Sequence, residues 1–167
     1  KGLGFSSADV ANAWLSRLPY QCVYTAERIT YRNLVNGLQP PETAAHGNPY
    51  REWIGAQIRA DFWGYAAAGN PALAADFAWR DASVSHVKNG IYGEMWAAAM
   101  VAASFVLTDP AQIIRAGMDQ IPAKCRLADY LEYVLEWVDL DVDYDTSVYR
   151  IHEMWNENSG HAWCHTI

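Results

Sequence analysis

The chain has 167 residues, of which 51% are hydrophobic and eight are tryptophan, and its formal net charge is −7. This length and composition are typical of one folded domain with a substantial core, and they exclude a disordered chain. The acidic charge and the lack of a Lys/Arg cluster argue against a nucleic-acid partner, which would require a basic face. We expect a single domain over residues 1–167.

The three cysteines, Cys22, Cys125 and Cys164, share no spacing typical of a zinc site or a disulfide framework. We expect free thiols in a reducing compartment. The longest apolar run, from Met95 to Leu107, is shorter than the roughly 20 residues that span a bilayer. No hydrophobic signal segment opens the sequence. These features predict a cytoplasmic protein without a membrane partner.

Capping residues mark the first two helices. Ser6 and Asp9 have the spacing of a capping box, and Pro19 would end the helix that follows. Thr25 can cap a second helix, which Gly37 would end.

The later helices are predicted from a polar cap followed by proline in the first turn. This pattern occurs at Asn48-Pro49, Asn70-Pro71 and Asp109-Pro110. Further helices are expected from about Gly90 to Leu107, from about Ala123 to Val138, and from near Asp145. No segment alternates between polar and apolar residues, so we predict an all-α fold. The alanine-rich stretches allow close helix approach and favour a compact orthogonal bundle.

A polar loop precedes the most apolar of these helices. It contains small hydrogen-bonding residues, a histidine and a first glycine: Ser83, Ser85, His86, Lys88, Asn89 and Gly90. A helix N-terminus offers unpaired N–H groups and partial positive charge, so this loop could bind an anion, with His86 and Asn89 fixing hydroxyls or a phosphate. The alternative is a capped turn with a histidine whose hydrogen bonds are satisfied. The spacing leaves both interpretations open.

The segment NPYREWIGAQIRADFWG, residues 48–64, interleaves charged groups with large aromatic side chains. A pocket that holds a sugar and a flat base would use this combination. The alternative is an amphipathic helix with solvated charges, in which Arg59 pairs with a neighbouring acid. This choice also stays open.

The acidic run Asp139, Asp141, Asp143 and Asp145 contains residue types that bind calcium, but its spacing does not match a calcium-binding loop. Counting from Asp141, an EF-hand loop would need Gly at the position of Thr146 and Glu at that of His152. We therefore expect a solvated turn and a helix N-cap there. The histidines His152, His161 and His165 are too dispersed to form a ligand set.

Four segments, taken together, connect the chain to a known family: LPYQCVYTAERITYRNLVNGLQPPETA, NPYREWIGAQIRADFWGYAAAGNP, LAADFAWRDASVSHVKNGIYGEMWAAAMVAA and HAWCHTI. They resemble the ADP-ribosylglycohydrolase family, the all-helical dimetal enzymes typified by dinitrogenase reductase-activating glycohydrolase. The resemblance covers nearly the whole chain. It implies that GAQIRADFWG lines an ADP-ribose cleft and that His86 faces the nucleotide sugar.

The substrate-binding residues that follow from the resemblance and the polar segments are Glu52, Gly55, Gln57, Arg59, Asp61, His86, Asn89, Gly90, Tyr92 and Gly93. No catalytic residue is assigned. The prediction requires that residues 55–63 and 85–93 face each other across a single cavity.

Family members hold two magnesium ions through an Asp-Asp-Thr-type motif and a Gly-x-Asp-Thr-Asp motif, and the chain contains neither. We therefore expect a partial domain whose metal ligands lie outside the chain. Missing segments or a partner chain would cover an exposed apolar face. The implied activity is metal-assisted hydrolysis of an N- or O-glycosidic bond at ADP-ribose, releasing it from a modified protein or small molecule. The alternatives are a non-catalytic module that binds ADP-ribose or another nucleotide, and a structural subunit.

Overall fold

The computed structural model describes residues 1–155, and this part of the chain consists of helices and loops without a strand. The all-α prediction is therefore confirmed. The helices are α1 (Ser7–Arg17), α2 (Thr25–Val35), α3 (Glu42–Ala45), α4 (Asp61–Ala66), α5 (Pro71–Ala82), α6 (Asn89–Ala103), α7 (Pro110–Met118), α8 (Arg126–Asp139) and α9 (Tyr144–Met154), with short 3₁₀ helices η1 (Gly2–Gly4), η2 (Tyr20–Cys22) and η3 (Gln57–Arg59).

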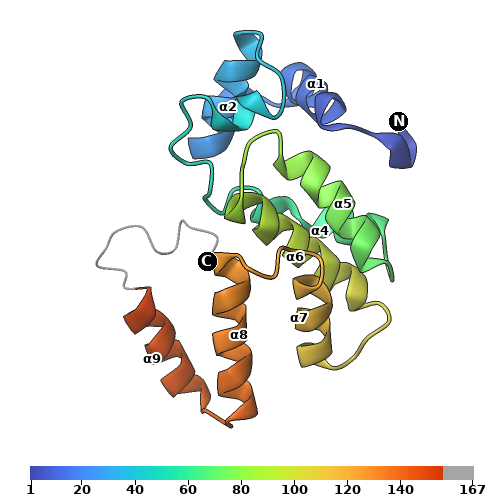
Figure 1. The fold of residues 1–167 in the computed structure, drawn as a ribbon. Helices are drawn as coiled ribbons and strands as arrows, with labels where there is room; N and C mark the ends of the chain where they lie inside the picture. Colours follow the sequence, from blue (N-terminus) through green and yellow to red (C-terminus); the bar gives the residue numbers. More distant parts are fainter. Residues whose placement is uncertain (156–167) are drawn as a thin grey trace.

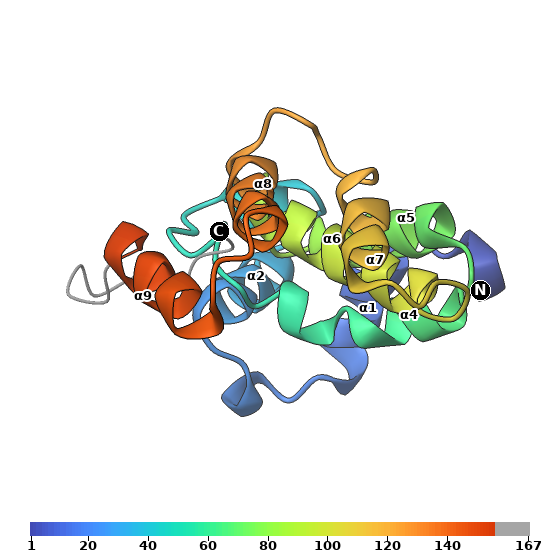
Figure 2. The same ribbon diagram turned by 90° about the horizontal axis from the view of Figure 1, so that it is seen from below.

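Helix α6 lies at the centre of the described structure (Figures 1 and 2). It packs against α5, α4 and η3, and it also contacts α7 and α8. Helices α1 and α2 lie at one end of the molecule, and α8 and α9 extend from the other (Figure 1). The polar side chains of α6, Asn89 and Glu94, lie in its N-terminal half.

Local capping explains most helix starts. The Ser6–Asp9 capping box is present, Asn70 and Asp109 each accept a backbone N–H at the start of a proline-led helix, and Asp143 caps α9 through Thr146. Asp143 thus confirms the expected turn and N-cap in the acidic run. The predicted cap at Thr25 is wrong by one residue, since Thr25 is the first residue of α2 and Tyr24 precedes it without a side-chain cap.

The helix predicted at Asn48-Pro49 is wrong. Residues 49–52 form turns, and the Asn48 side chain is buried. Its Oδ1 accepts from the Tyr50 backbone N–H, and its Nδ2 donates to the Ser85 carbonyl at 3.1 Å. Because this amide ties two loops together in the interior, it does not start a helix.

Small residues allow α4 and α6 to approach closely. A Cβ at Gly64 would lie 2.5 Å from Cγ1 of Val101 and 2.8 Å from the Ala98 carbonyl oxygen. Buried alanines, including Ala60 and Ala102, complete this contact. The close approach of α4 holds η3, and with it Arg59, against α6.

We expect Gly64→Ala to lower the free energy of unfolding by about 1–2 kcal/mol. Overpacking of this kind costs roughly 1–3 kcal/mol, and the better helix propensity of alanine offsets up to about 1 kcal/mol. Urea unfolding followed by circular dichroism measures the change. Gly4→Ala is the control, because no heavy atom lies within 4 Å of a Cβ at Gly4. Equal stability of the two variants would show that the α4–α6 contact tolerates a wider spacing.

The two described cysteines agree with the sequence prediction. Cys22 and Cys125 are free thiols. Cys164, His161 and His165 lie outside the described residues, as does the segment HAWCHTI. None of the helices in residues 1–155 combines the length and apolar character needed to cross a bilayer.

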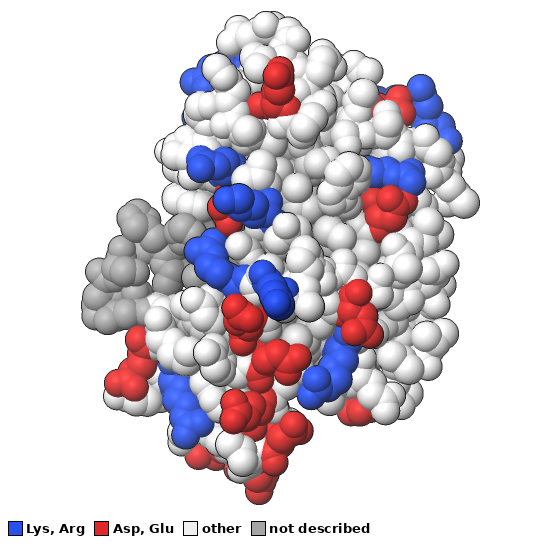
Figure 3. All heavy atoms as spheres, viewed as in Figure 1, with Lys and Arg blue, Asp and Glu red and all other residues white. Residues whose placement is uncertain are grey.

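Charged side chains are unevenly distributed over the face shown in Figure 3. Acidic groups gather over the C-terminal helices, and basic groups lie nearer the middle of the molecule. Several large apolar side chains of α4 and its neighbours are also exposed: Ile58, Phe62, Tyr65, Phe105 and Val106.

Candidate functional site

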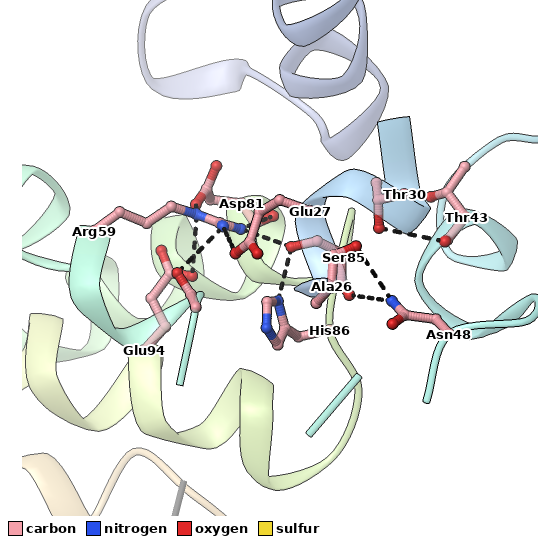
Figure 4. A network of polar contacts seen from close by, with 11 residues as sticks. Ala26, Glu27, Thr30, Thr43, Asn48, Arg59, Asp81, Ser85, His86 and Glu94 are labelled. Carbon is pink, nitrogen blue, oxygen red and sulfur yellow. Dashed lines mark hydrogen bonds and ion pairs between the residues drawn. The ribbon is translucent and has the colours of Figure 1, made fainter. Parts of the chain in front are cut away.

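Arg59 is the centre of a cluster that joins four elements (Figure 4). It ends η3, and its guanidinium contacts one carboxyl group from each of three helices. Nη1 lies 3.1 Å from Oε1 of Glu27 in α2, Nε donates to Asp81 in α5, and Nε lies 3.9 Å from Oε2 of Glu94 in α6. A single cation is therefore placed among three acids.

The cluster continues into the polar loop before α6. Nη2 of Arg59 donates to Oγ of Ser85 at 2.9 Å, and this oxygen lies 2.8 Å from Nδ1 of His86. The two predicted segments, residues 55–63 and 85–93, thus meet directly (Figure 4).

Burial and charge determine which acids hold protons. Burial raises the pKa of Glu94 well above its usual value, and the neighbouring charge of Asp81 raises it further. Neither carboxyl oxygen of Glu94 has a hydrogen-bond partner among the described residues. Burial also raises the pKa of Glu27, although Arg59 opposes this shift. The cluster contains three carboxyl groups but one cation, Arg59. Glu94 is therefore the acid that we expect to be protonated.

Arg59 remains charged in this environment. Burial is the largest single influence and opposes its charge, but Asp81, Glu94 and Glu27 together outweigh that cost and raise the pKa of Arg59. Its side chain is 24% exposed and the ring of Trp14 lies 5.1 Å from the guanidinium carbon. The aromatic face adds a favourable cation–π contact.

His86 is fully buried behind Arg59. Burial, followed by the positive charge of Arg59, lowers the pKa of His86 to about 3, so its imidazole is neutral near pH 7. Nδ1 contacts Ser85, whereas Nε2 has no hydrogen-bond partner among the described residues.

The polar loop joins distant parts of the chain. Oγ of Ser83 lies 2.9 Å from Oγ of Ser7 in α1. The hydroxyl of Thr43 in α3 donates to the Val84 carbonyl at 2.7 Å. These buried contacts favour the interpretation of the loop as a turn with largely satisfied polar groups.

Asn89 connects the start of α6 to two further elements. Its Oδ1 accepts the backbone N–H of Leu127 in α8 at 3.3 Å, and its Nδ2 donates to Glu52 at 3.2 Å. Glu52 also accepts from Arg126 at 2.9 Å. Asn89 and Glu52 therefore hold α8 against the N-terminus of α6.

A cavity of about 480 Å³ opens on the other side of Arg59. Its walls are mainly apolar and aromatic, and Glu27 and Arg59 are its charged members. The lining residues are Trp14, Leu18, Cys22, Val23, Tyr24, Thr25, Glu27, Trp53, Ile54, Gly55, Ile58 and Arg59. We call this cavity the α1–α2 pocket.

Gly55 positions Glu27 in the α1–α2 pocket. A Cβ at residue 55 would lie 2.2 Å from Oε1 of Glu27 and 2.9 Å from its carboxyl carbon. A larger residue would displace the carboxyl group from its contact with Arg59. The glycine is therefore explained by close packing of a charged side chain against the backbone.

The expectation of a single cavity between the two predicted segments is wrong. Arg59 and Ser85 fill the space with a direct contact, and no residue from 85–93 lines the α1–α2 pocket. Of the ten predicted binding residues, only Gly55 and Arg59 do so. A role of the ten residues in substrate binding stays a prediction.

The remaining predicted residues have other surroundings. Gln57 lines a smaller pocket of about 240 Å³ beside α8 and α9, and Asp61 is exposed at the start of α4. Gly90 is buried against His86 and the Arg51 carbonyl, while Tyr92 packs beside α8. Gly93 is buried within α6.

Sequence reasoning missed Glu27, Asp81 and Glu94, together with the aromatic wall at Trp14, whereas Trp53 belongs to the aromatic segment that it singled out. A signal existed for Glu94. It lies among apolar residues in α6, and an acid in such a helix is rarely buried without a partner. No local pattern distinguishes Glu27 from a solvent-exposed glutamate.

The described residues do not suit the two magnesium ions that the resemblance implies. Among residues 1–155, no group of three or more His, Cys, Asp or Glu side chains could hold a metal ion. The acids nearest to one another surround Arg59, whose positive charge would repel a divalent cation at that position.

Comparison with known proteins adds one finding. The sequence model of a family described as ADP-ribosylglycohydrolase matches residues 1–165, nearly the whole chain. No curated protein and no solved structure matches the chain. The helical architecture agrees with this family. The chain therefore belongs to the ADP-ribosylglycohydrolase family.

Proposed function

We propose that the protein containing this chain hydrolyses a glycosidic bond at ADP-ribose and so removes ADP-ribose from a modified protein or small molecule. The observation that carries the proposal is the family match over residues 1–165. Membership supports a glycohydrolase activity in general. ADP-ribose as the group released, and a nitrogen or oxygen acceptor, are the specific parts of the proposal.

Metal assistance by two magnesium ions is also part of the proposal. Bound magnesium would polarise ribose hydroxyls and position water at the anomeric carbon. The residues described here supply no such site, so its ligands would come from other residues. The Arg59 cluster would contribute by holding η3, α2, α5 and α6 in fixed relation.

Release of free ADP-ribose tests the activity. The full-length protein is incubated with peptides ADP-ribosylated on arginine or on serine, and the product is separated by chromatography. We expect release from at least one peptide with magnesium present, and at least a 100-fold lower rate with excess chelator. Release that is unaffected by chelation would contradict metal assistance, while no release from either peptide would contradict the hydrolytic proposal.

A non-catalytic binding module is the second candidate, because residues 1–155 present a ligand-sized pocket without a metal-ligand group. Calorimetric titration with ADP-ribose separates the two candidates. Binding without release favours the module. A folded protein that gives no heat at millimolar ADP-ribose would reject both candidates and leave a structural role.

Two further parts of the proposal concern the surroundings of the protein. We place it in the cytoplasm, which suits the free thiols of Cys22 and Cys125. We also propose that another segment or a partner chain covers the exposed side chains of Ile58, Phe62 and Tyr65. We propose neither a nucleic-acid partner nor a membrane partner.

A further inference from the structure

We infer that the protein forms a two-fold symmetric dimer through an exposed apolar surface on η3, α4 and the turn after α6, which we call the α4 patch. Its members are large side chains that are each more than half exposed: Ile58, Phe62, Tyr65, Phe105 and Val106. The chain that covers this surface is therefore a second copy of the same protein. The inference holds whether or not the protein is catalytic.

The α4 patch is one continuous surface. Phe62 and Tyr65 lie about one helical turn apart in α4. The ring centroids of Tyr65 and Phe105 lie 6.4 Å apart, which joins α4 to the turn after α6. A Cβ at Gly69 would lie 3.3 Å from Cγ1 of Val106, so this valine packs beside the residues that follow α4. The exposed apolar side chains of the two segments therefore meet.

The residues between the exposed ones hold the α4 patch in place. Trp63 stacks on Phe5, with their ring centroids 4.9 Å apart. A Cβ at Gly64 would lie 2.5 Å from Cγ1 of Val101, so α4 lies directly on α6. Because these contacts fix α4, little conformational entropy is lost when the patch binds a partner.

The segments that carry most of the α4 patch have no charge. Residues 62–75 and 95–108 contain no Asp, Glu, Lys, Arg or His, although the net charge of the chain is −7. The acidic groups gather instead over the C-terminal helices (Figure 3). The α4 patch therefore lets two copies meet without bringing acidic segments of like charge together.

This composition favours a second copy over other partners. Interfaces between different proteins use charged groups to fix orientation and to reject wrong partners. Homodimer interfaces are more apolar, and in a two-fold dimer the same patch serves both copies. A membrane surface would favour Lys or Arg beside the apolar side chains, whereas the acids Asp61 and Asp109 border the patch in sequence.

The size of the α4 patch suits half of a dimer interface. Its five large side chains, each more than half exposed, present roughly 500–600 Å² of apolar surface. Small exposed neighbours, including Ala66, Ala68 and Ser104, enlarge this area. A specific interface buries about 600–1,000 Å² on each partner. The patch and its surroundings are therefore large enough for a stable dimer.

The dimer would border the α1–α2 pocket. Ile58 is 76% exposed, precedes Phe62 by four residues and also lines this pocket. A second copy that covers Ile58 therefore lies at the edge of the α1–α2 pocket.

Sedimentation of the full-length protein tests the inference. Runs between about 1 and 100 μM cover the range in which a micromolar dissociation constant is measured. We expect the sedimenting mass to rise with concentration to that of two chains. A monomer at every concentration would overturn the inference.

Two substitutions of opposite charge test the location of the interface. Phe62→Glu and Tyr65→Lys each place two like charges in a symmetric apolar contact, and each is expected to raise the dissociation constant of the dimer at least tenfold. Val138→Glu is the matched control, because Val138 is 63% exposed on α8 outside the patch, and it should leave the dimer unchanged.

All three positions are exposed, and circular dichroism checks that the variants fold. If one patch variant does not fold, the other decides. A dimer that the folded patch variants leave intact would overturn the inference, because its interface would lie elsewhere. Neither measurement involves ADP-ribose, so such a failure is distinct from a failure of the proposed hydrolysis.

Discussion

Arg59→Met is expected to lower the free energy of unfolding by about 3–5 kcal/mol at neutral pH, the typical cost of removing one partner from a buried ion pair. Methionine keeps much of the apolar stem of arginine but removes its charge and its hydrogen bonds to Asp81 and Ser85. Asp81 and Glu94, both in the interior, would then lack their only cationic contact among the described residues. Chemical denaturation at pH 7 measures the loss.

Arg115→Met is the matched control for this prediction. Arg115 pairs with Glu132 at 3.7 Å, and both side chains are at least half exposed. Exposed pairs of this kind contribute about 0–1 kcal/mol. A similar small loss in both variants would show that solvent, and not Arg59, neutralises the acids of the cluster.

Much of the helical framework could be predicted because its signals are local. Asn70-Pro71 and Asp109-Pro110 each place a side-chain acceptor and a proline within one turn, and both begin helices as expected. The same pattern at Asn48 fails because its amide is used by a loop distant in sequence. Local chemistry determines a helix start only where tertiary contacts do not compete for the capping group.

The candidate site was less predictable because its members come from separate helices. Arg59 is 32 residues from Glu27 and 22 from Asp81, so no motif spacing connects them. The alternative of an amphipathic helix with solvated charges is wrong, since residues 49–59 form turns and η3, and the acids that Arg59 contacts are distant in sequence. His86 was expected in a cavity, yet its loop is drawn into the interior by the contacts of Thr43 and Asn48.

Glu94→Gln is expected to change how stability depends on pH. The folded state raises the pKa of Glu94 through burial and the charge of Asp81, whereas the unfolded chain ionises near 4.5. Above that pH the folded state therefore holds a proton that the unfolded state has released. Folding stability then falls by about 1.4 kcal/mol per pH unit until the pH passes the raised pKa of Glu94.

Glutamine cannot ionise, so this contribution is absent from the variant. The stability of Glu94→Gln relative to the unsubstituted protein should increase by about 1.4 kcal/mol per unit as pH rises above about 4.5, and level off above the pKa of Glu94. The difference between the two proteins isolates Glu94 from His86, which remains neutral in both and whose lowered pKa reduces stability as pH falls below about 6.5.

Urea unfolding of both proteins between pH 5 and pH 8 tests this expectation. Any constant cost of burying the glutamine amide shifts the whole curve and leaves its slope unchanged, so the slope is the decisive quantity. Glu132→Gln, at an exposed position, should run parallel to the unsubstituted protein. Parallel curves for Glu94→Gln as well would mean that Glu94 is ionised in the folded state, and that Arg59 balances all three carboxylates.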